Sequence, residues 1–184
     1  MGNSHSDDIL LLQEFRNPAT KEKAFTAILK KYQEKLYWHI RRLVVQHEDA
    51  NDVLQNACIK VWNGLENFRE DSQLYTWLYR IATNESLTYL EQLKRKSSIS
   101  IDDEESPVAA KLQAEKDFDA NKAEWKLQMA IQQLPEKQRL VFNLRYYDEM
   151  PYEEMSKVLD TSEGALKASY HHAVKKIEDF ILNH

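Results

Sequence analysis

Three aromatic residues and three consecutive cations in one segment are the side chains most suited to chemistry. Tyr75, Trp77 and Tyr79 stand at alternate positions, and the segment ends in Lys94-Arg95-Lys96. Clustered Lys and Arg side chains bind phosphates, and exposed aromatic rings stack on unpaired bases. Residues two apart on a helix diverge by about 200°, so at least one ring should be partly exposed. The segment could bind nucleic acid; a solvated helix end and an aromatic protein contact are the alternatives.

A second candidate site lies near the end of the chain. A short helix is expected from Pro151, a turn at Asp160-Thr161 and a longer helix from Ser162. One side of the longer helix is apolar, and its other side is polar and weakly basic. This layout is typical of a helix-turn-helix, whose second helix enters the major groove of DNA, although other helical hairpins share it. The polar side carries Lys167, Ser169, His171, His172 and Lys175.

Composition predicts that helices position both sites. Hydrophobic residues make up 42% of the 184 residues and charged residues 30%, with only three Gly and four Pro. Apolar residues recur every three or four positions, which is the period of an amphipathic helix. Helices are expected over about 7–16, 20–45, 48–68 and 72–96, then through 125–134, through 140–148, and after residues 151 and 162.

The negative charge is concentrated in one place. Residues 97–124 hold eight acidic and three basic residues, which accounts for the whole formal net charge of −5. The opening of this segment, SSISIDDEESP, has no helical period and contains Pro, so it is typical of a linker. We predict an all-α protein: two small helical domains, 1–96 and 120–184, joined by a flexible acidic linker, 97–119, with the helix-turn-helix in the second domain.

Several classes of function are excluded or disfavoured. The three Gly are too far apart for a glycine-rich phosphate loop. Cys58 is the only cysteine, so neither an intrachain disulfide nor a multi-thiolate zinc site can form. The six His show no metal-ligand spacing, and no nucleophile–base pair stands out. We therefore expect no enzyme activity, metal or cofactor. No apolar run could cross a membrane and no secretory leader opens the chain, so a cytoplasmic protein is expected.

Four short motifs follow one another along the two predicted domains. They are Glu48–Ala57 with Lys60-Val61-Trp62, Tyr75–Asn84, Leu134–Phe142 with Tyr152–Met155, and Gly164–Lys167 with Ala173–Lys176. The first two resemble the polymerase-binding helix and the promoter-melting helix of bacterial sigma factors of the extracytoplasmic-function (ECF) group. The last two resemble the second domain of that group through its recognition helix. Each motif is short, but the four in this order are specific.

The resemblance implies an initiation factor that gives core RNA polymerase its promoter specificity. It assigns three sets of residues. The −10 element would be captured, melted and held by Phe68, Arg69, Trp77, Arg80, Asn84, Lys94, Arg95 and Lys96. The −35 element would be contacted by Arg145, Lys167, Ser169, His171, His172 and Lys175. The clamp helices of the polymerase would contact Asp49, Asp52, Gln55 and Asn56.

The resemblance also implies partners. These are core RNA polymerase, through its clamp helices and flap, promoter DNA and an anti-sigma factor, with no direct insertion into a membrane. The acidic linker would occupy the RNA path of the polymerase.

This sequence departs from the family pattern in both DNA-binding helices. Thr88 and Glu91 replace an Asp and an Arg that are frequent on the melting helix. On the recognition helix, Ala168, Ser169 and His172 stand where many members have a Ser and two Arg. The DNA sequence preferred by other members therefore cannot be transferred.

Two alternatives from other classes stay open at this point. One is a stand-alone helix-turn-helix regulator with a helical sensor domain, which would bind a palindrome as a dimer without polymerase. The other is a helical interaction module that binds no DNA.

Overall fold

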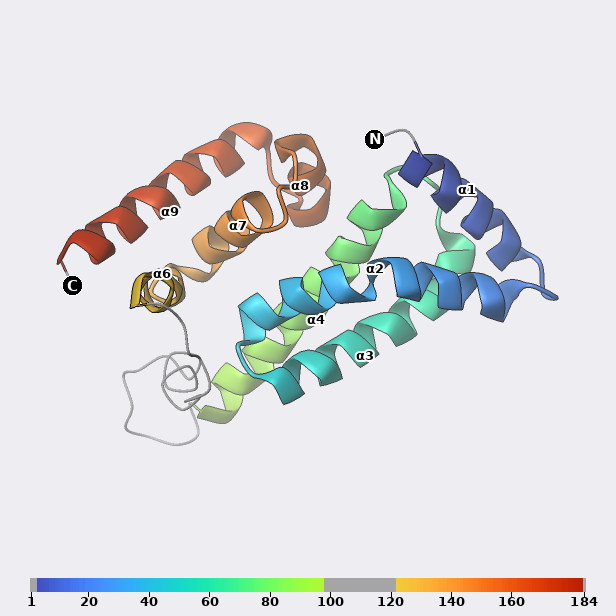
Figure 1. Cartoon of the computed structure of the whole chain (residues 1–184), viewed down its shortest axis with the longest axis horizontal. Coiled ribbons are helices and arrows are strands. Elements are labelled where there is room, and N and C mark those ends of the chain that lie inside the picture. The colour runs from blue at the N-terminus through green and yellow to red at the C-terminus, as the bar shows by residue number, and fades with distance from the viewer. Residues whose placement is uncertain (1–2, 98–121, 184) are drawn as a thin grey trace.

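The structure, a computed structural model, describes residues 3–97 and 122–183 of the chain. All regular elements in these two ranges are helical, which confirms the predicted all-α class (Figure 1). The N-terminal block contains α1 (Asn3–Arg16), α2 (Lys21–Val44), α3 (His47–Gly64), a 3₁₀ turn η1 (Leu65–Asn67) and α4 (Leu74–Ser97). The C-terminal block contains α6 (Lys122–Gln132), α7 (Glu136–Tyr146), α8 (Tyr152–Leu159) and α9 (Glu163–Asn183). The predicted linker, 97–119, lies almost wholly outside the described residues.

The N-terminal block is a bundle built around α2. Its buried positions Ile28, Tyr32, Leu36 and Ile40 follow the helical period, so one stripe of α2 faces α1, α3 and α4. The helix α1 is anchored by Asp8, whose buried carboxylate accepts hydrogen bonds from Lys31 (2.6 Å) and from the Tyr32 hydroxyl (2.7 Å). Packing on α2 also positions α3 and α4, which carry two of the three predicted sites.

Truncating a core leucine of α4 should destabilise the protein substantially. Leu78 is 1% exposed and Leu10 is 59% exposed. Leu78→Ala removes buried methyl groups and leaves a cavity, so we expect the free energy of unfolding to fall by about 3 kcal/mol. The matched substitution Leu10→Ala should change it by less than about 0.5 kcal/mol. Urea denaturation of both variants measures the difference, and equal losses would show that α4 is not packed as described.

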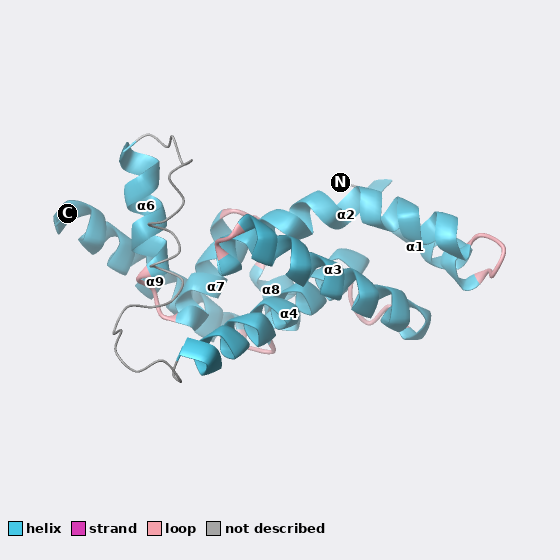
Figure 2. Ribbon diagram, turned by 90° about the horizontal axis from the view of Figure 1, so that it is seen from below, coloured by secondary structure: helices cyan, strands magenta, loops and turns pink. Residues whose placement is uncertain are grey.

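The C-terminal block forms the predicted helix-turn-helix. Leu159 ends α8, Asp160 adopts a left-handed conformation (φ 49°), and the Ser162 hydroxyl accepts a hydrogen bond from the Ala165 amide at the start of α9. Figure 2 shows α6 and α9 beside each other at the end of the molecule away from α1. A second cluster fills the space between α6, α7 and α9: Ala130, Ile131, Leu134, Phe142, Ala173 and Ile177.

The two blocks pack directly against each other. The helix α8 contacts α4, and α7 contacts α2. One continuous apolar cluster runs from the N-terminal bundle into Leu144, Met150, Met155 and Val158 of the C-terminal block. The interface therefore covers one side of α4, the helix that carries the predicted −10 residues.

Candidate nucleic-acid interface

The segment between η1 and α4 is held in place by packing of two aromatic rings. Phe68 is buried, and its ring centroid lies 5.1 Å from that of the half-buried Trp77. The Trp77 ring also lies against Gly64, where a Cβ atom would sit 3.1 Å from the ring. Of the three alternating aromatic residues, Tyr75 and Trp77 are half-buried and Tyr79 is buried, as expected from their angular separation. Packing of Trp77 thus fixes the start of α4 to the preceding loop.

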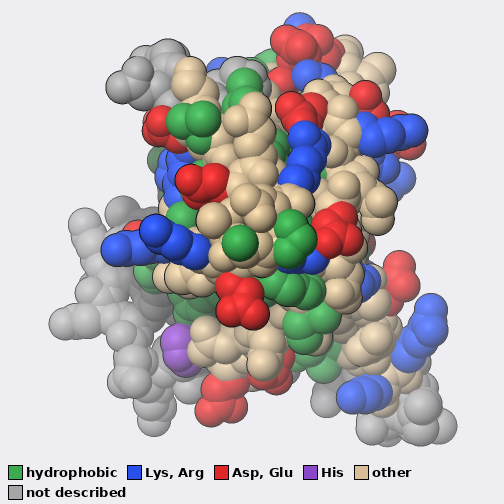
Figure 3. All heavy atoms as spheres, turned by 90° about the vertical axis from the view of Figure 1, so that its right-hand side faces the viewer, with side chains coloured by type: hydrophobic (Ala, Val, Ile, Leu, Met, Phe, Trp, Pro, Cys, Tyr) green, Lys and Arg blue, Asp and Glu red, His purple; other side chains and the backbone are tan. Residues whose placement is uncertain are grey.

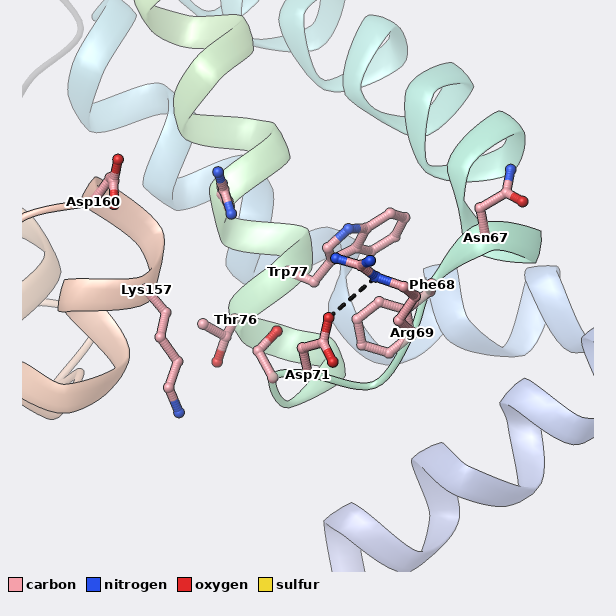
Figure 4. A pocket seen from close by; sticks show the side chains of 10 residues that line it. Asn67, Phe68, Arg69, Asp71, Thr76, Trp77, Lys157 and Asp160 are labelled. Carbon is pink, nitrogen blue, oxygen red and sulfur yellow. Dashed lines mark ion pairs between the residues drawn. The ribbon is translucent and has the colours of Figure 1, made fainter.

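Four of the predicted −10 residues line one cavity of about 410 Å³. Figure 4 shows Phe68 and Trp77 side by side, with Arg69 in front of them and joined by an ion pair to Asp71 (3.2 Å). Arg80 also lines the cavity, and the other lining residues are Asn67, Asp71, Ser72, Thr76, Lys157 of α8 and Asp160, which follows α8. Aromatic, cationic and hydroxyl groups around one hollow can stack on a base and bind its edge and phosphate.

The other predicted −10 residues lie along α4, outside this cavity. Asn84 is exposed one helical turn after Arg80. The exposed cations at 94–96 follow Arg80 by about 20 Å along the axis of α4. Lys94 forms an ion pair with Glu136 of α7, and Arg95 pairs with Glu91 at 3.7 Å. The predicted −10 residues therefore lie in three places along α4: the cavity at its start, Asn84 in its middle and the cations at its C-terminal end.

The predicted −35 residues of α9 form an outward surface. Lys167, His171, His172 and Lys175 are exposed, and Ser169 is half-buried. Lys167 forms an ion pair with Glu163 (3.3 Å), and its ammonium lies 5.5 Å from the centroid of the Tyr152 ring. Arg145 lies beside this surface: its guanidinium donates to the Met150 carbonyl (3.2 Å) and lies 5.1 Å from the centroid of the same Tyr152 ring. Arg145 therefore also supports the loop before α8.

The predicted polymerase-contact residues lie on α3. Asp52, Gln55 and Asn56 are exposed and recur at three- and four-residue steps, so they share one face. Asp49 is half-buried. The pKa of the Tyr89 phenol is raised by burial and by its hydrogen bond to Asp49, which places this carboxylate against α4. Asp49 therefore also joins α3 to α4. The exposed Ile59 continues the same face one turn later.

On the face drawn in Figure 3, charge is mixed: Lys and Arg side chains are interspersed with Asp and Glu side chains. Because nonspecific DNA affinity depends on the number of phosphates that a protein neutralises, such a surface predicts weak binding to DNA by the chain alone.

Six lining residues of the cavity lie outside the predicted −10 set, and two of these come from the C-terminal block. Lys157 lies on α8 and Asp160 directly follows that helix, about 80 positions after the other lining residues. Nothing in their local sequence connects them with the start of α4. Their position follows only from the packing of α8 on α4. Across the described parts of the chain, no set of three or more His, Cys, Asp or Glu side chains is grouped to hold a metal ion. No helix there is long and apolar enough to cross a membrane.

Two family models match the chain in the order of the two blocks. Residues 28–96 match Sigma-70 region 2, and residues 124–177 match Sigma-70, region 4. The RNA polymerase sigma-H factor of Pseudomonas aeruginosa is 33% identical over 172 residues, which span 85% of this chain and 86% of that protein. The ECF RNA polymerase sigma-E factor of Escherichia coli K12 is 33% identical over 167 residues, covering 86% of each.

Solved structures show the same fold. CnrH in complex with the cytosolic domain of CnrY matches 96% of this chain with a TM-score of 0.69 and 20% identity, covering 97% of that chain. The sigma factor RpoE of Bartonella quintana, solved with the anti-sigma factor NepR, matches 86% of this chain with the same TM-score and identity, covering 97% of that chain.

The fold and the paired helical blocks define a transcription factor built from sigma regions 2 and 4. The chain belongs to the sigma-70 family, in its extracytoplasmic-function group.

Proposed function

We propose that this protein binds core RNA polymerase and directs it to promoters through two DNA-binding surfaces, one on each block. The observation that supports this most strongly is the presence of regions 2 and 4, in that order, on one chain. The domains proposed are 1–96 for region 2, 97–119 for the acidic linker and 120–184 for region 4. Its role is to direct RNA polymerase to promoters and not to catalyse a reaction itself. We place it in the cytoplasm with the polymerase.

The cavity at the start of α4 is proposed to receive an unpaired base of the −10 element. Pulling a base out of the duplex costs a few kcal/mol, which stacking and edge contacts can offset. Phe68 and Trp77 give the cavity an aromatic wall, while Arg69 and Arg80 supply cations beside it. Asn84 and the cations at 94–96 extend the contact along α4, where they would bind the edge of a second base and backbone phosphates.

The exposed side of α9 is proposed to contact the −35 element. Lys167 and His171 lie one turn apart on this side, so both can reach one groove. The exposed face of α3 around Gln55 would bind the clamp helices. Because CnrH and RpoE were solved with CnrY and NepR, we also propose that an anti-sigma factor binds this protein.

Removing the Lys167 cation from α9 should weaken promoter binding in a salt-dependent way. For Lys167→Ala, we expect holoenzyme affinity for the promoter duplex to fall several-fold, and the slope of log K against log[salt] to decrease by about 0.9. Lys176→Ala, an exposed lysine on α9 outside the predicted set, is the matched control. Fluorescence anisotropy at several salt concentrations measures both values. Identical slopes for the two variants would place the −35 contact elsewhere.

A mobility-shift experiment separates this function from a stand-alone regulator. We expect a labelled duplex from the protein's own upstream region to be shifted by the chain together with core polymerase. The chain alone, at the same concentration, should not shift it specifically. A specific complex formed by the chain alone and unaffected by polymerase would favour the regulator.

A further inference from the structure

The loop between η1 and α4, residues 68–73, supplies one wall of the proposed −10 cavity. Phe68, Arg69 and Asp71 of this loop line the cavity, together with Ser72 (Figure 4). Among the described residues, no backbone–backbone hydrogen bond starts or ends at residues 69–72, and the side chains of 69–71 are exposed. A loop without backbone hydrogen bonds keeps one conformation only if other contacts hold it. Side chains must therefore fix the place of Arg69 beside the cavity.

The last residue of α1 makes such a contact with the loop. The Arg16 guanidinium donates from Nη2 to the Glu70 carboxylate (2.8 Å) and to the Phe68 backbone carbonyl (3.4 Å). Within residues 3–97 and 122–183, Arg16 is the one group outside the loop that hydrogen-bonds to any of residues 69–72. Its two acceptors flank Arg69. The contact thus spans the residue that the proposed function places beside an unpaired base.

Glu70 has a backbone conformation that favours glycine. Its φ is 61°, in the left-handed region, where the Cβ atom of any other residue is crowded. The carboxylate that Arg16 binds belongs to this same residue. An ion pair that forms only in this conformation stabilises it and offsets the backbone strain. Arg16 therefore selects the left-handed conformation of Glu70 and, with it, the path of the loop past Arg69.

The end of α1 is itself packed firmly against α3. Phe15 is 1% exposed, and its ring meets that of Trp62 edge to face, with the centroids 5.5 Å apart. At the start of α2, the Lys21 ammonium lies 4.9 Å from the centroid of the Trp62 ring and pairs with Glu66 of η1. Arg16 thus extends from a helix end that the bundle core holds in place.

The exposure of the Arg16–Glu70 pair separates its effect from folding. The two side chains are 47% and 41% exposed, so neither fills space in the core. An ion pair at this exposure contributes little to the stability of a domain, so its effect should fall on the loop that it holds. Arg16 also precedes the segment that matches Sigma-70 region 2, which begins at residue 28. The family match therefore assigns Arg16 no part in promoter binding.

We propose that Arg16 is a positioning residue for capture of the −10 base: it holds the loop at 68–73 in the conformation that presents Phe68 and Arg69 to the cavity. This role rests on the proposed function, because the loop needs a fixed shape only if a base enters the cavity. Arg16 does not touch the base. It acts through Phe68 and Glu70, and it reduces the entropy lost when the loop is ordered around the base.

The test compares holoenzymes, each formed from core polymerase and one variant of the full chain, on two labelled probes from the chain's own upstream region. One probe is the single strand that carries the −10 element, and the other is the −35 duplex. The variants are Arg16→Ala, Glu70→Ala, Glu70→Gly and Arg16→Ala/Glu70→Gly. Lys30→Ala, which removes an exposed cation of α2 outside the loop contact, is the matched control. Fluorescence anisotropy gives each affinity.

We expect Arg16→Ala and Glu70→Ala to bind the −10 strand about three- to fivefold more weakly than the unsubstituted chain, because each removes the ion pair and leaves the strained conformation unsupported. Glu70→Gly should bind within about twofold of normal, since glycine adopts a left-handed conformation without strain. Adding Arg16→Ala to Glu70→Gly should then change the affinity little further. Affinity for the −35 duplex and the melting temperature of the chain should stay constant in all four variants.

Three results would overturn the positioning role. Equal binding of the −10 strand by Arg16→Ala and Lys30→Ala would show that Arg16 does not support the loop. A loss with Arg16→Ala that persists in full in the Glu70→Gly background would show that Arg16 contacts the strand itself. A parallel loss of −35 binding would show a general effect of charge. If the unsubstituted holoenzyme does not bind the −10 strand at all, the proposed function fails, and the positioning role fails with it.

Discussion

The double substitution Arg80→Ala/Asn84→Ala should slow promoter opening by about 100-fold or more while leaving polymerase binding unchanged. Both side chains are exposed on α4, one turn apart, and Arg80 lines the cavity beside Trp77. A good contact to a base edge contributes about 1–3 kcal/mol, so two lost contacts together lower the rate by about this factor. The loss should fall on melting because an unpaired base exists only after the strands separate.

Fluorescence of a 2-aminopurine placed in the −10 element measures opening directly. The matched control is Gln92→Ala, an exposed amide on the same helix outside the predicted set, which should open the promoter at the normal rate. Normal opening by the double variant would show that this part of α4 does not hold the melted strand. A parallel loss of polymerase affinity would point to misfolding of the block instead.

The triple substitution Asp52→Ala/Gln55→Ala/Asn56→Ala should weaken binding to core polymerase by about 100-fold. These side chains share the exposed face of α3, and none of them is buried in the bundle. A few central residues carry most of the affinity of an interface, so removing three adjacent polar groups should cost several kcal/mol. Exposed substitutions rarely alter stability by more than about 0.5 kcal/mol, so the melting temperature should stay nearly constant.

Titration of fluorescently labelled chain with core polymerase gives both affinities. Gln33→Ala, an exposed amide on α2, is the control for loss of a polar surface group. If the triple variant binds as tightly as this control, the polymerase contact lies on another face of the bundle.

Local patterns in the sequence predicted the helices closely. The helix expected over 20–45 spans Lys21–Val44, and the one expected over 72–96 spans Leu74–Ser97. Both helices have long apolar stripes, which indicate the helix before its packing partners are known. The helix expected from residue 7 begins at Asn3 instead, because the polar residues before it carry no apolar period to mark its start.

The residues that line the proposed −10 cavity could be predicted only in part. Phe68 and Trp77 were identified because the family resemblance assigns both to the −10 set, and the structure packs them together. Lys157 and Asp160 could not be found, since their place in the wall depends on α8 lying against α4. The spacing of apolar residues within a segment does not show which distant segment it will contact.

The packing of the two blocks against each other could not be predicted from the sequence either. Near-neutral blocks and an acidic linker predicted separate domains, and a lone acidic residue such as Asp148 is usually a solvated loop charge. Its burial against His39 and Arg42 brings it next to a helix that lies more than 100 positions earlier in the chain. Likewise, the cations at 94–96 predicted a phosphate site but gave no sign that Lys94 pairs with Glu136.

Transcription in a reconstituted system tests the central claim most directly. The purified chain is mixed with core RNA polymerase and a template that carries the chain's own upstream region, and the 5′ ends of the transcripts are mapped. We predict a discrete start site that depends on the chain and is lost with Arg80→Ala/Asn84→Ala. No chain-dependent transcript, together with specific duplex binding by the chain alone, would contradict the account and identify a stand-alone regulator.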